Sequence, residues 1–243
     1  MSEQRIERID MSTSIAAREE FSEVLKGRAS AYRMFSRLFL KPLSEEDIEE
    51  LAAMDFISRA LSLEDAGLLA EGFNDMGRGL LKRNSGTRQT LATDYTMCYD
   101  GVATVSDEVS VPYASVFLSE KALLYQEPRH KVYELFCAEG IKLKTSIDLP
   151  EDHLSFELEF LAILSDRALT ALEAGDRAEA RRNLELSRDF INGHILTWID
   201  LLSERANKLL TSRFYRGVSK ATRGYLDLDL ETIGDILEDL DDE

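Results

Sequence analysis

The chain has 243 residues, of which 44% are hydrophobic and 31% are charged, a balance typical of a soluble globular protein with a large core. Its formal net charge of −17 argues against a nucleic-acid-binding protein, because phosphates are bound through an excess of lysine and arginine. No apolar run approaches the roughly 20 residues of a membrane-spanning helix, and the polar N-terminus lacks the apolar core of a secretory signal, so we expect a cytoplasmic protein without stable membrane insertion.

Helical periodicity runs through most of the chain, whereas strand-like alternation is scarce. After a disordered or loosely ordered start over residues 1–17, apolar residues three or four apart predict a helix over 18–40 that ends before Pro42. Ser44, which precedes three acidic residues, has the pattern of a helix N-cap. The next predicted helices cover residues 45–53, 63–81 (N-cap Ser62), 88–100, 116–125 (N-cap Ser115) and 128–139.

Residues 102–113 have no helical period and form a loop of a length that is usually functional or mobile. Aromatic residues flank this loop and the short helix after it: Tyr95, Tyr99, Tyr113, Phe117 and Tyr125. Such residues usually belong to the core, and the alternative is a groove with aromatic walls that accepts an apolar peptide.

The second half begins with the most apolar helix, which we expect over residues 150–174. Pro150 suits the first helical position, and the acidic residues after it complement the helix dipole. Apolar residues cover most of the helix circumference, which predicts burial on several sides. Three ionisable residues, Asp152, His153 and Glu157, lie at its start, and the last two share one face. This arrangement indicates either a structural network or a binding site.

A turn at Gly175, with Asp176 as N-cap, leads into a helical pattern over 177–210 that Gly193 is expected to bend. A last helix is predicted over 212–225. Nine acidic and no basic residues follow between positions 227 and 243. We expect residues 229–243 to form a solvated, partly frayed tail, and the alternative is an electrostatic attraction site for a basic segment.

Motifs of common enzymes are missing. The sequence has no phosphate-binding loop, dinucleotide fingerprint or nucleophile elbow, and its three histidines lie in different helices without metal-site spacing. Cys98 and Cys137 form no metal or redox motif, so both are expected in the core. We interpret His194 as a hydrogen-bonded core residue. His153 differs, because the helix dipole disfavours its cation while nearby carboxylates favour it, which would leave it titrating near neutrality.

The segment Asp152-His153-x-x-x-Glu157-x-x-Phe160-Leu161 resembles the signature of the TorD/DmsD/NarJ family of redox-enzyme maturation chaperones. Other matching segments follow in the family's order over residues 29–228, namely 32–39, 94–99, 111–116, 190–198 and 214–215. Two positions depart from the pattern: Cys98-Tyr99 stands where Leu-Phe is commoner, and Tyr113 where some members carry tryptophan. The resemblance therefore does not identify the client.

The resemblance implies an all-α, multi-helix TorD-like bundle over residues 18–228. A larger N-terminal part, about 18–147, would be joined to a C-terminal helical part, about 148–228, by a hinge near the Asp-His motif. Some members exchange these parts between chains, so both a monomer and a domain-swapped dimer are open. Members are not enzymes and need no metal or cofactor of their own. They bind the apo catalytic subunit of a molybdenum-containing oxidoreductase, often through its twin-arginine signal peptide, and hold back export until the molybdenum cofactor is inserted.

The resemblance also implies a peptide-binding site. An apolar groove would be lined by Tyr95, Cys98, Tyr99, Pro112 and Tyr113, and the peptide or the hinge would be contacted by Asp152, His153 and Glu157. Carboxylates suit the basic end of such a peptide, because they pair with guanidinium through two parallel hydrogen bonds. One alternative is a NarJ-like assembly factor that binds a non-signal region of its client. The other is a helical metal-dependent hydrolase built on Asp152, His153 and Glu157.

Overall fold

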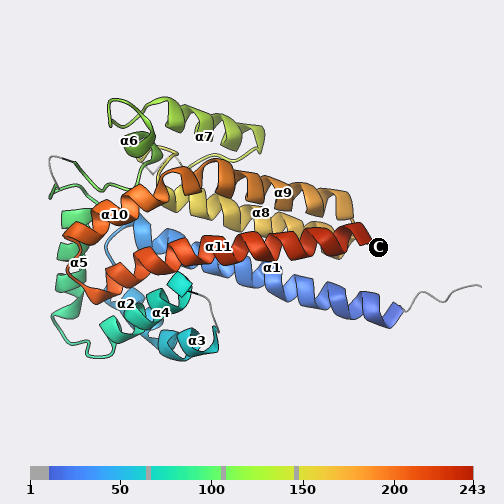
Figure 1. Cartoon of the computed structure of the whole chain (residues 1–243), viewed down its shortest axis with the longest axis horizontal. Helices are drawn as coiled ribbons and strands as arrows, with labels where there is room; N and C mark the ends of the chain where they lie inside the picture. The colour runs from blue at the N-terminus through green and yellow to red at the C-terminus, as the bar shows by residue number, and fades with distance from the viewer. Residues whose placement is uncertain (1–10, 64–66, 105–107, 145–147, 243) are drawn as a thin grey trace, which may run out of the picture.

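The structure, a computed structural model, describes residues 11–63, 67–104, 108–144 and 148–242 (Figure 1). Within these ranges the chain is helical, and its only β-structure is isolated bridging, which confirms the predicted all-α fold. The helices are α1 (Met11–Leu40), α2 (Glu45–Ala53), α3 (Phe56–Ser62), α4 (Gly67–Leu80), α5 (Thr87–Cys98), α6 (Ala114–Leu118), α7 (Glu127–Ala138), α8 (Leu154–Ala174), α9 (Arg177–Gly193), the 3₁₀-helix η1 (Ile195–Thr197), α10 (Ile199–Leu209) and α11 (Arg213–Asp242).

Four long helices form the body of the molecule. Helix α8 packs between α1 and α9, and α11 contacts α1, α4 and α9 (Figure 1). The short helices α2 to α5 gather at one end, and α6 and α7 pack together along one edge (Figure 1). Because α1 and α8 belong to the two parts expected from the sequence, these parts share a packed interface. Their connection through a hinge stays a prediction.

Helix boundaries follow local signals where those signals are strong. Helix α2 has the expected bounds, and Ser44 forms a capping box with Asp47. Ser62 does not cap a helix, because it is the last residue of α3, a helix that was not predicted. Of the start expected to be loosely ordered, residues 1–10 lie outside the described residues, and α1 begins at Met11 instead of near residue 18. Ser115 lies inside α6, which ends at Leu118.

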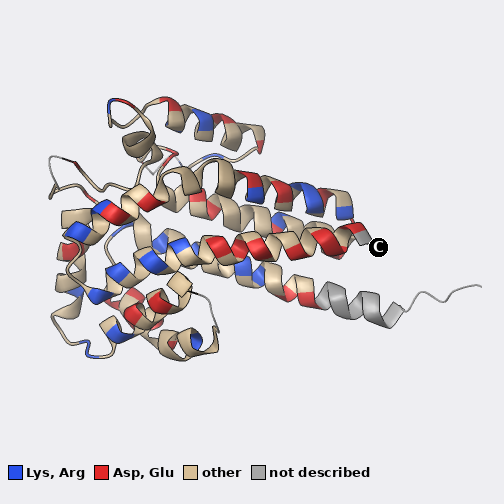
Figure 2. Ribbon diagram, in the orientation of Figure 1, with Lys and Arg blue, Asp and Glu red and all other residues tan. Residues whose placement is uncertain are grey.

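The acidic end of the chain is helical instead of frayed over residues 229–242, which corrects the prediction for the tail, and Glu243 lies outside the described residues. Helix α11 continues to Asp242, and acidic residues recur along its second half (Figure 2). Most of them are exposed, whereas Asp229 is buried. Apolar residues at helical spacing bury the opposite side: Leu226, Ile233, Ile236 and Leu237. Arg177 donates to the carbonyls of Asp239 at 3.3 Å and Leu240 at 2.9 Å, which satisfies acceptors that the last turn of a helix leaves open. Arg181 also donates to the Leu237 carbonyl at 3.1 Å.

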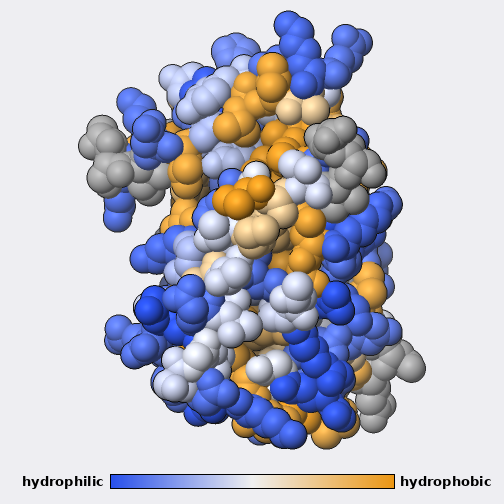
Figure 3. Space-filling view, turned by 90° about the vertical axis from the view of Figure 1, so that its left-hand side faces the viewer, coloured by the Kyte–Doolittle hydropathy of each residue, from blue (hydrophilic) through white to orange (hydrophobic). Residues whose placement is uncertain are grey.

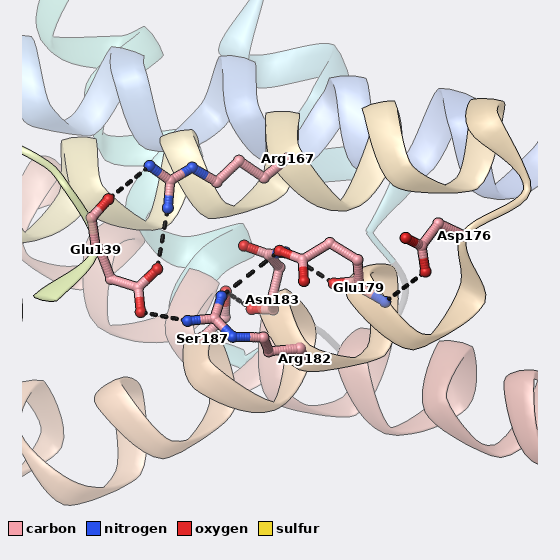
Figure 4. Close-up of polar contacts among 7 residues, drawn as sticks. All are labelled: Glu139, Arg167, Asp176, Glu179, Arg182, Asn183 and Ser187. Carbon is pink, nitrogen blue, oxygen red and sulfur yellow. Dashed lines mark hydrogen bonds and ion pairs between the residues drawn. The ribbon is translucent and has the colours of Figure 1, made fainter.

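A largely buried glutamate at the end of α7 links this helix to α8 and α9. Glu139, which caps α7, accepts hydrogen bonds from Arg167 of α8 at 3.0 Å and from Arg182 of α9 at 2.6 Å (Figure 4). The same view shows Asp176 accepting from the backbone N–H of Glu179 at the start of α9, as the sequence predicted. Cys137, expected in the core, lies exposed on α7, because the buried side of this helix is formed by residues such as Val132 and Phe136.

Glycines let α4 and α11 approach at backbone distance. A Cβ atom on Gly224 would lie 2.2 Å from the backbone nitrogen of Leu69, whereas one on Gly234 of the same helix would meet no atom within 4 Å. Replacing Gly224 by alanine is therefore expected to lower the free energy of unfolding by about 1–3 kcal/mol through overpacking. Gly234→Ala is the matched control and should gain up to about 1 kcal/mol from helix propensity. Urea unfolding measures both, and equal effects of the two substitutions would contradict the close approach.

Candidate peptide-binding site at the start of helix α8

Helix α8 begins at Leu154, four residues later than the sequence suggested. The preceding backbone pairs with another segment: Leu154 N–H donates to the Pro112 carbonyl at 2.8 Å, and Ala114 N–H donates to the Asp152 carbonyl at 3.0 Å. This antiparallel bridge between Tyr113 and His153 keeps His153 extended. Pro150 therefore lies in a turn before the helix, and a long-range contact sets the helix start.

Asp152 stabilises a different helix from the one predicted. Its side chain is fully buried, and its Oδ2 accepts from the backbone N–H of Ser115 at 2.8 Å, in the first turn of α6. Burial raises the pKa of Asp152, and the Ser115 hydrogen bonds oppose that rise. Its Oδ1 has no hydrogen-bond partner among the described residues. Asp152 thus links α6 to the start of α8 through Oδ2, whereas Oδ1 is buried without a hydrogen-bond partner among the described residues.

His153 is a neutral N-cap. Its Nδ1 accepts from the Ser155 N–H at 3.1 Å, which requires an unprotonated nitrogen, and its ring meets Tyr113 edge to face at 4.7 Å between centroids. The residue is 3% exposed, and burial lowers its pKa to about 3. The expectation that His153 titrates near neutrality is therefore wrong, because burial lowers its pKa while the carboxylates of Asp152 and Glu157 bind other partners.

Glu157 pairs with His194, not with His153. Its Oε1 lies 2.6 Å from Nε2 of His194, which stands where α9 ends. Burial raises the pKa of Glu157, and His194 opposes that rise. For His194 burial lowers the pKa, but Glu157 outweighs burial and the net shift is upward. The prediction of a hydrogen-bonded core histidine is confirmed, although its partner, 37 residues away, was not predicted.

The aromatic residues of α5 form a neighbouring cluster in the core. The Tyr95 hydroxyl donates to the Phe39 carbonyl at 2.7 Å, and the Tyr99 ring contacts those of Tyr95 and Tyr215. The Cys98 side chain lies 3.3 Å from Ser110 Oγ. Ser110 leads directly to Pro112 and Tyr113, so the chain itself joins this cluster to the start of α8.

One residue of the matching segment 94–99, Asp94, was not among the predicted site residues. Asp94, on α5, accepts from the backbone N–H groups of Thr211 at 2.7 Å and Ser212 at 3.0 Å, and from both hydroxyls as well. It fixes the turn between α10 and α11 beside the aromatic cluster. An isolated aspartate in the middle of a helix carries no sequence signal for such a contact, because its partners lie more than a hundred residues away.

All eight residues proposed for the site are buried. Pro112, Tyr113, Asp152, His153 and Glu157 lie together at the start of α8, whereas Tyr95, Cys98 and Tyr99 lie in the adjoining cluster. In this conformation the five residues at the start of α8 form a closed seam between the 110–115 segment and α8. A peptide reaches these side chains only when the seam opens.

The three residues of the hydrolase alternative hold separate partners instead of a shared point. Asp152 binds the Ser115 N–H, His153 binds the Ser155 N–H, and Glu157 binds His194. Across the described ranges, no group of three or more His, Cys, Asp or Glu side chains is placed to hold a metal ion. In the same part of the chain, no helix has the length and apolar character needed to span a membrane.

The chain is similar to known proteins over most of its length. A model of the family described as nitrate reductase delta subunit matches residues 64–204. Chaperone protein TorD of Vibrio cholerae serotype O1 is 27% identical over 223 residues, which cover 91% of this chain and 98% of that protein. Proteins of the same name are 25% identical in Vibrio parahaemolyticus, covering 83% of this chain and 92% of the relative, and in Aliivibrio salmonicida, covering 84% and 93%.

Proposed function

Because the chain belongs to the nitrate reductase delta subunit family, and within it is TorD-like, we propose that it is a chaperone for the catalytic subunit of a molybdenum-containing oxidoreductase. One observation carries this proposal: similarity to proteins named chaperones extends over nearly the full length of both chains. The protein is accordingly classed with chaperones and not with enzymes. It would hold the apo client in the cytoplasm until the molybdenum cofactor is inserted.

We further propose that the client's twin-arginine signal peptide binds at the seam between the 110–115 segment and the start of α8. Asp152 Oδ1 and Glu157 Oε2 are buried there without hydrogen-bond partners among the described residues. Buried carboxylate oxygens are costly when unpaired and bind guanidinium strongly. If the seam opens, these two oxygens are available to arginine, and the Tyr113 ring is available to the apolar part of the peptide.

Titration calorimetry with the apo form of a candidate molybdoenzyme client tests the proposal. The full-length apo client and its isolated signal peptide should both release heat on binding. Asp152→Asn keeps an acceptor for the Ser115 N–H but removes the charge, so we expect it to weaken peptide binding at least about tenfold. Glu139→Gln is the matched control, because Glu139 is also a largely buried carboxylate and lies outside the seam.

The outcomes separate the alternatives. Binding of a client without its signal peptide, and not of the peptide, would favour a NarJ-like assembly factor that recognises another region. An unchanged affinity of the Asp152→Asn variant would remove the seam from the proposal and leave the chaperone function in place. The absence of any binding to several molybdoenzyme clients would reject the chaperone function itself.

A further inference from the structure

A hydrogen-bonded pair between Glu157 and His194 borders the seam. Glu157 Oε1 lies 2.6 Å from His194 Nε2, and the Glu157 side chain is fully buried, whereas the His194 side chain is 15% exposed. The second carboxylate oxygen, Oε2, is buried without a hydrogen-bond partner among the described residues. His194 therefore occupies one oxygen of a buried carboxylate and leaves the other oxygen unpaired.

The position of His194 favours its protonated form. His194 is the C-cap of α9, where the negative end of the helix dipole stabilises a cation, and its ring stacks on Phe190 with 5.0 Å between centroids. Burial and Lys131 of α7 lower the pKa of His194, whereas Glu157 of α8 and Asp152 before α8 raise it, and the net shift is upward from 6.5. Below pH 6.5 the imidazole is therefore mainly protonated while the seam is closed.

His194 connects the buried carboxylates of the seam with water. Asp152 and Glu157 are fully buried, and apolar side chains gather on the adjoining surface formed by α5, α6 and α10 (Figure 3). His153 stays neutral, because burial lowers its pKa to about 3. Of these four residues, His194 is the one that is both partly exposed and able to bind a proton near neutral pH. The closed seam therefore exchanges protons with solvent through His194.

A guanidinium group needs both oxygens of a carboxylate for its strongest pairing. Arginine donates two parallel hydrogen bonds to a carboxylate, whereas the ammonium of lysine acts as a point charge and can bind a single oxygen. In the closed seam Oε1 of Glu157 is bound to His194, so only Oε2 is open to a ligand. An arginine can therefore form two hydrogen bonds with Glu157 only when His194 leaves Oε1.

We propose that His194 is a positioning residue of the peptide site, which holds Glu157 while the seam is closed and yields this carboxylate to a client guanidinium with release of a proton. The inference rests on the proposed binding of the signal peptide at the seam. The N–H bond of the imidazolium breaks and the proton passes to solvent, because His194 loses its counter-charge and gains a cationic neighbour. Protons and client arginine therefore compete for one carboxylate.

This competition makes the affinity depend on pH in a defined direction. At low pH the free protein binds a proton that the complex lacks, so binding has to release it and is weakened. The dissociation constant should therefore fall as the pH rises, by up to about tenfold per pH unit where His194 is protonated in the free protein. A lysine peptide that binds only Oε2 leaves the His194 proton in place and should show no such change.

Titration calorimetry with two versions of one signal peptide tests this inference. The natural peptide and a version with lysine in place of both arginines are titrated at about pH 6.5 and about pH 8, each in two buffers that differ in their heat of protonation. With the wild-type protein at the lower pH, the natural peptide should give a buffer-dependent heat that reports proton release, and the lysine peptide should not. His194→Gln keeps an N–H donor for Glu157 but does not titrate, so this release should disappear.

Two results would overturn the inference. A heat that is independent of the buffer for the natural peptide and the wild-type protein would show that His194 keeps its proton. Undiminished proton release in His194→Gln would assign the proton to another group. If this variant folds poorly, the two peptides on the wild-type protein decide the question. A failure of the proposed function is distinguishable, because the wild-type protein would then bind neither peptide at either pH.

Discussion

Replacing Arg28 by methionine is expected to lower the free energy of unfolding by about 3–5 kcal/mol. Arg28 of α1 forms a two-bond ion pair with Asp229 of α11, at 2.5 and 2.8 Å, and both side chains are almost completely buried. The Asp229 carboxylate also accepts from Tyr32, and Arg28 donates to Ser165 of α8 at 2.8 Å. Removing the guanidinium leaves a buried carboxylate that has lost its counter-charge.

The expected loss reflects an uncompensated charge more than the net strength of the pair. Burial lowers the pKa of Arg28, but Asp229 outweighs burial and the net shift is upward, so the arginine stays charged. The double variant Arg28→Met/Asp229→Leu removes both charges and should recover most of the lost stability. Lys208→Met breaks an exposed pair with Glu204 and should cost at most about 1 kcal/mol.

Urea unfolding of the four proteins measures these differences. A single variant Arg28→Met that unfolds like the Lys208→Met control would show that the pair is accessible to water. A double variant no more stable than the single variant would show that packing around Arg28, and not its charge, holds α1, α8 and α11 together.

The Arg28–Asp229 pair shows why the acidic end of the chain was not predicted to be a packed helix. Nine acids between residues 227 and 243 suggest a solvated tail, and charge counting cannot distinguish Asp229, which is buried, from its exposed neighbours. The helical spacing of Ile233, Ile236 and Leu237 was the available signal for a packed helix. The partner of Asp229 lies 201 residues earlier, so no local pattern contains it.

Local chemistry predicted the fold where the determining contacts are local. Ser44 and Asp176 cap helices as expected, and Gly175 ends α8 in the left-handed conformation. Gly193 marks the end of α9, where a bend was predicted. These features depend on residues within one turn, and the sequence displays them directly.

The seam was predictable in part. The motif places Asp152, His153 and Glu157 at one helix start, and the resemblance adds Tyr113, which the structure brings against His153. The partners of the three ionisable groups were not predictable from the local sequence. The Tyr113–His153 bridge sets the helix start at Leu154, and His194, the partner of Glu157, lies at the end of α9. Burial then decides the protonation of His153, and burial is a property of the whole fold.

Replacing His153 by asparagine is expected to remove a large part of the acid sensitivity of the protein. In the native state burial holds the pKa of His153 at about 3, whereas its ordinary value is 6.5. Below pH 6.5 His153 therefore binds a proton in the unfolded chain but not in the native state. The free energy of unfolding consequently falls as the pH decreases from 6.5 toward 3. The loss amounts to about 2 kcal/mol at pH 5 and about 5 kcal/mol over the whole window.

Asparagine suits this test because it is a strong N-cap and does not titrate. Loss of the contact with Tyr113 will lower stability at pH 7.5, but by an amount that does not change with pH. Asp152, Glu157 and His194 titrate in both proteins, so the difference between their urea-unfolding curves from pH 7.5 to 5 isolates His153. Parallel curves for wild type and His153→Asn would mean that His153 accepts a proton in the native state, and hence that the seam is open to water.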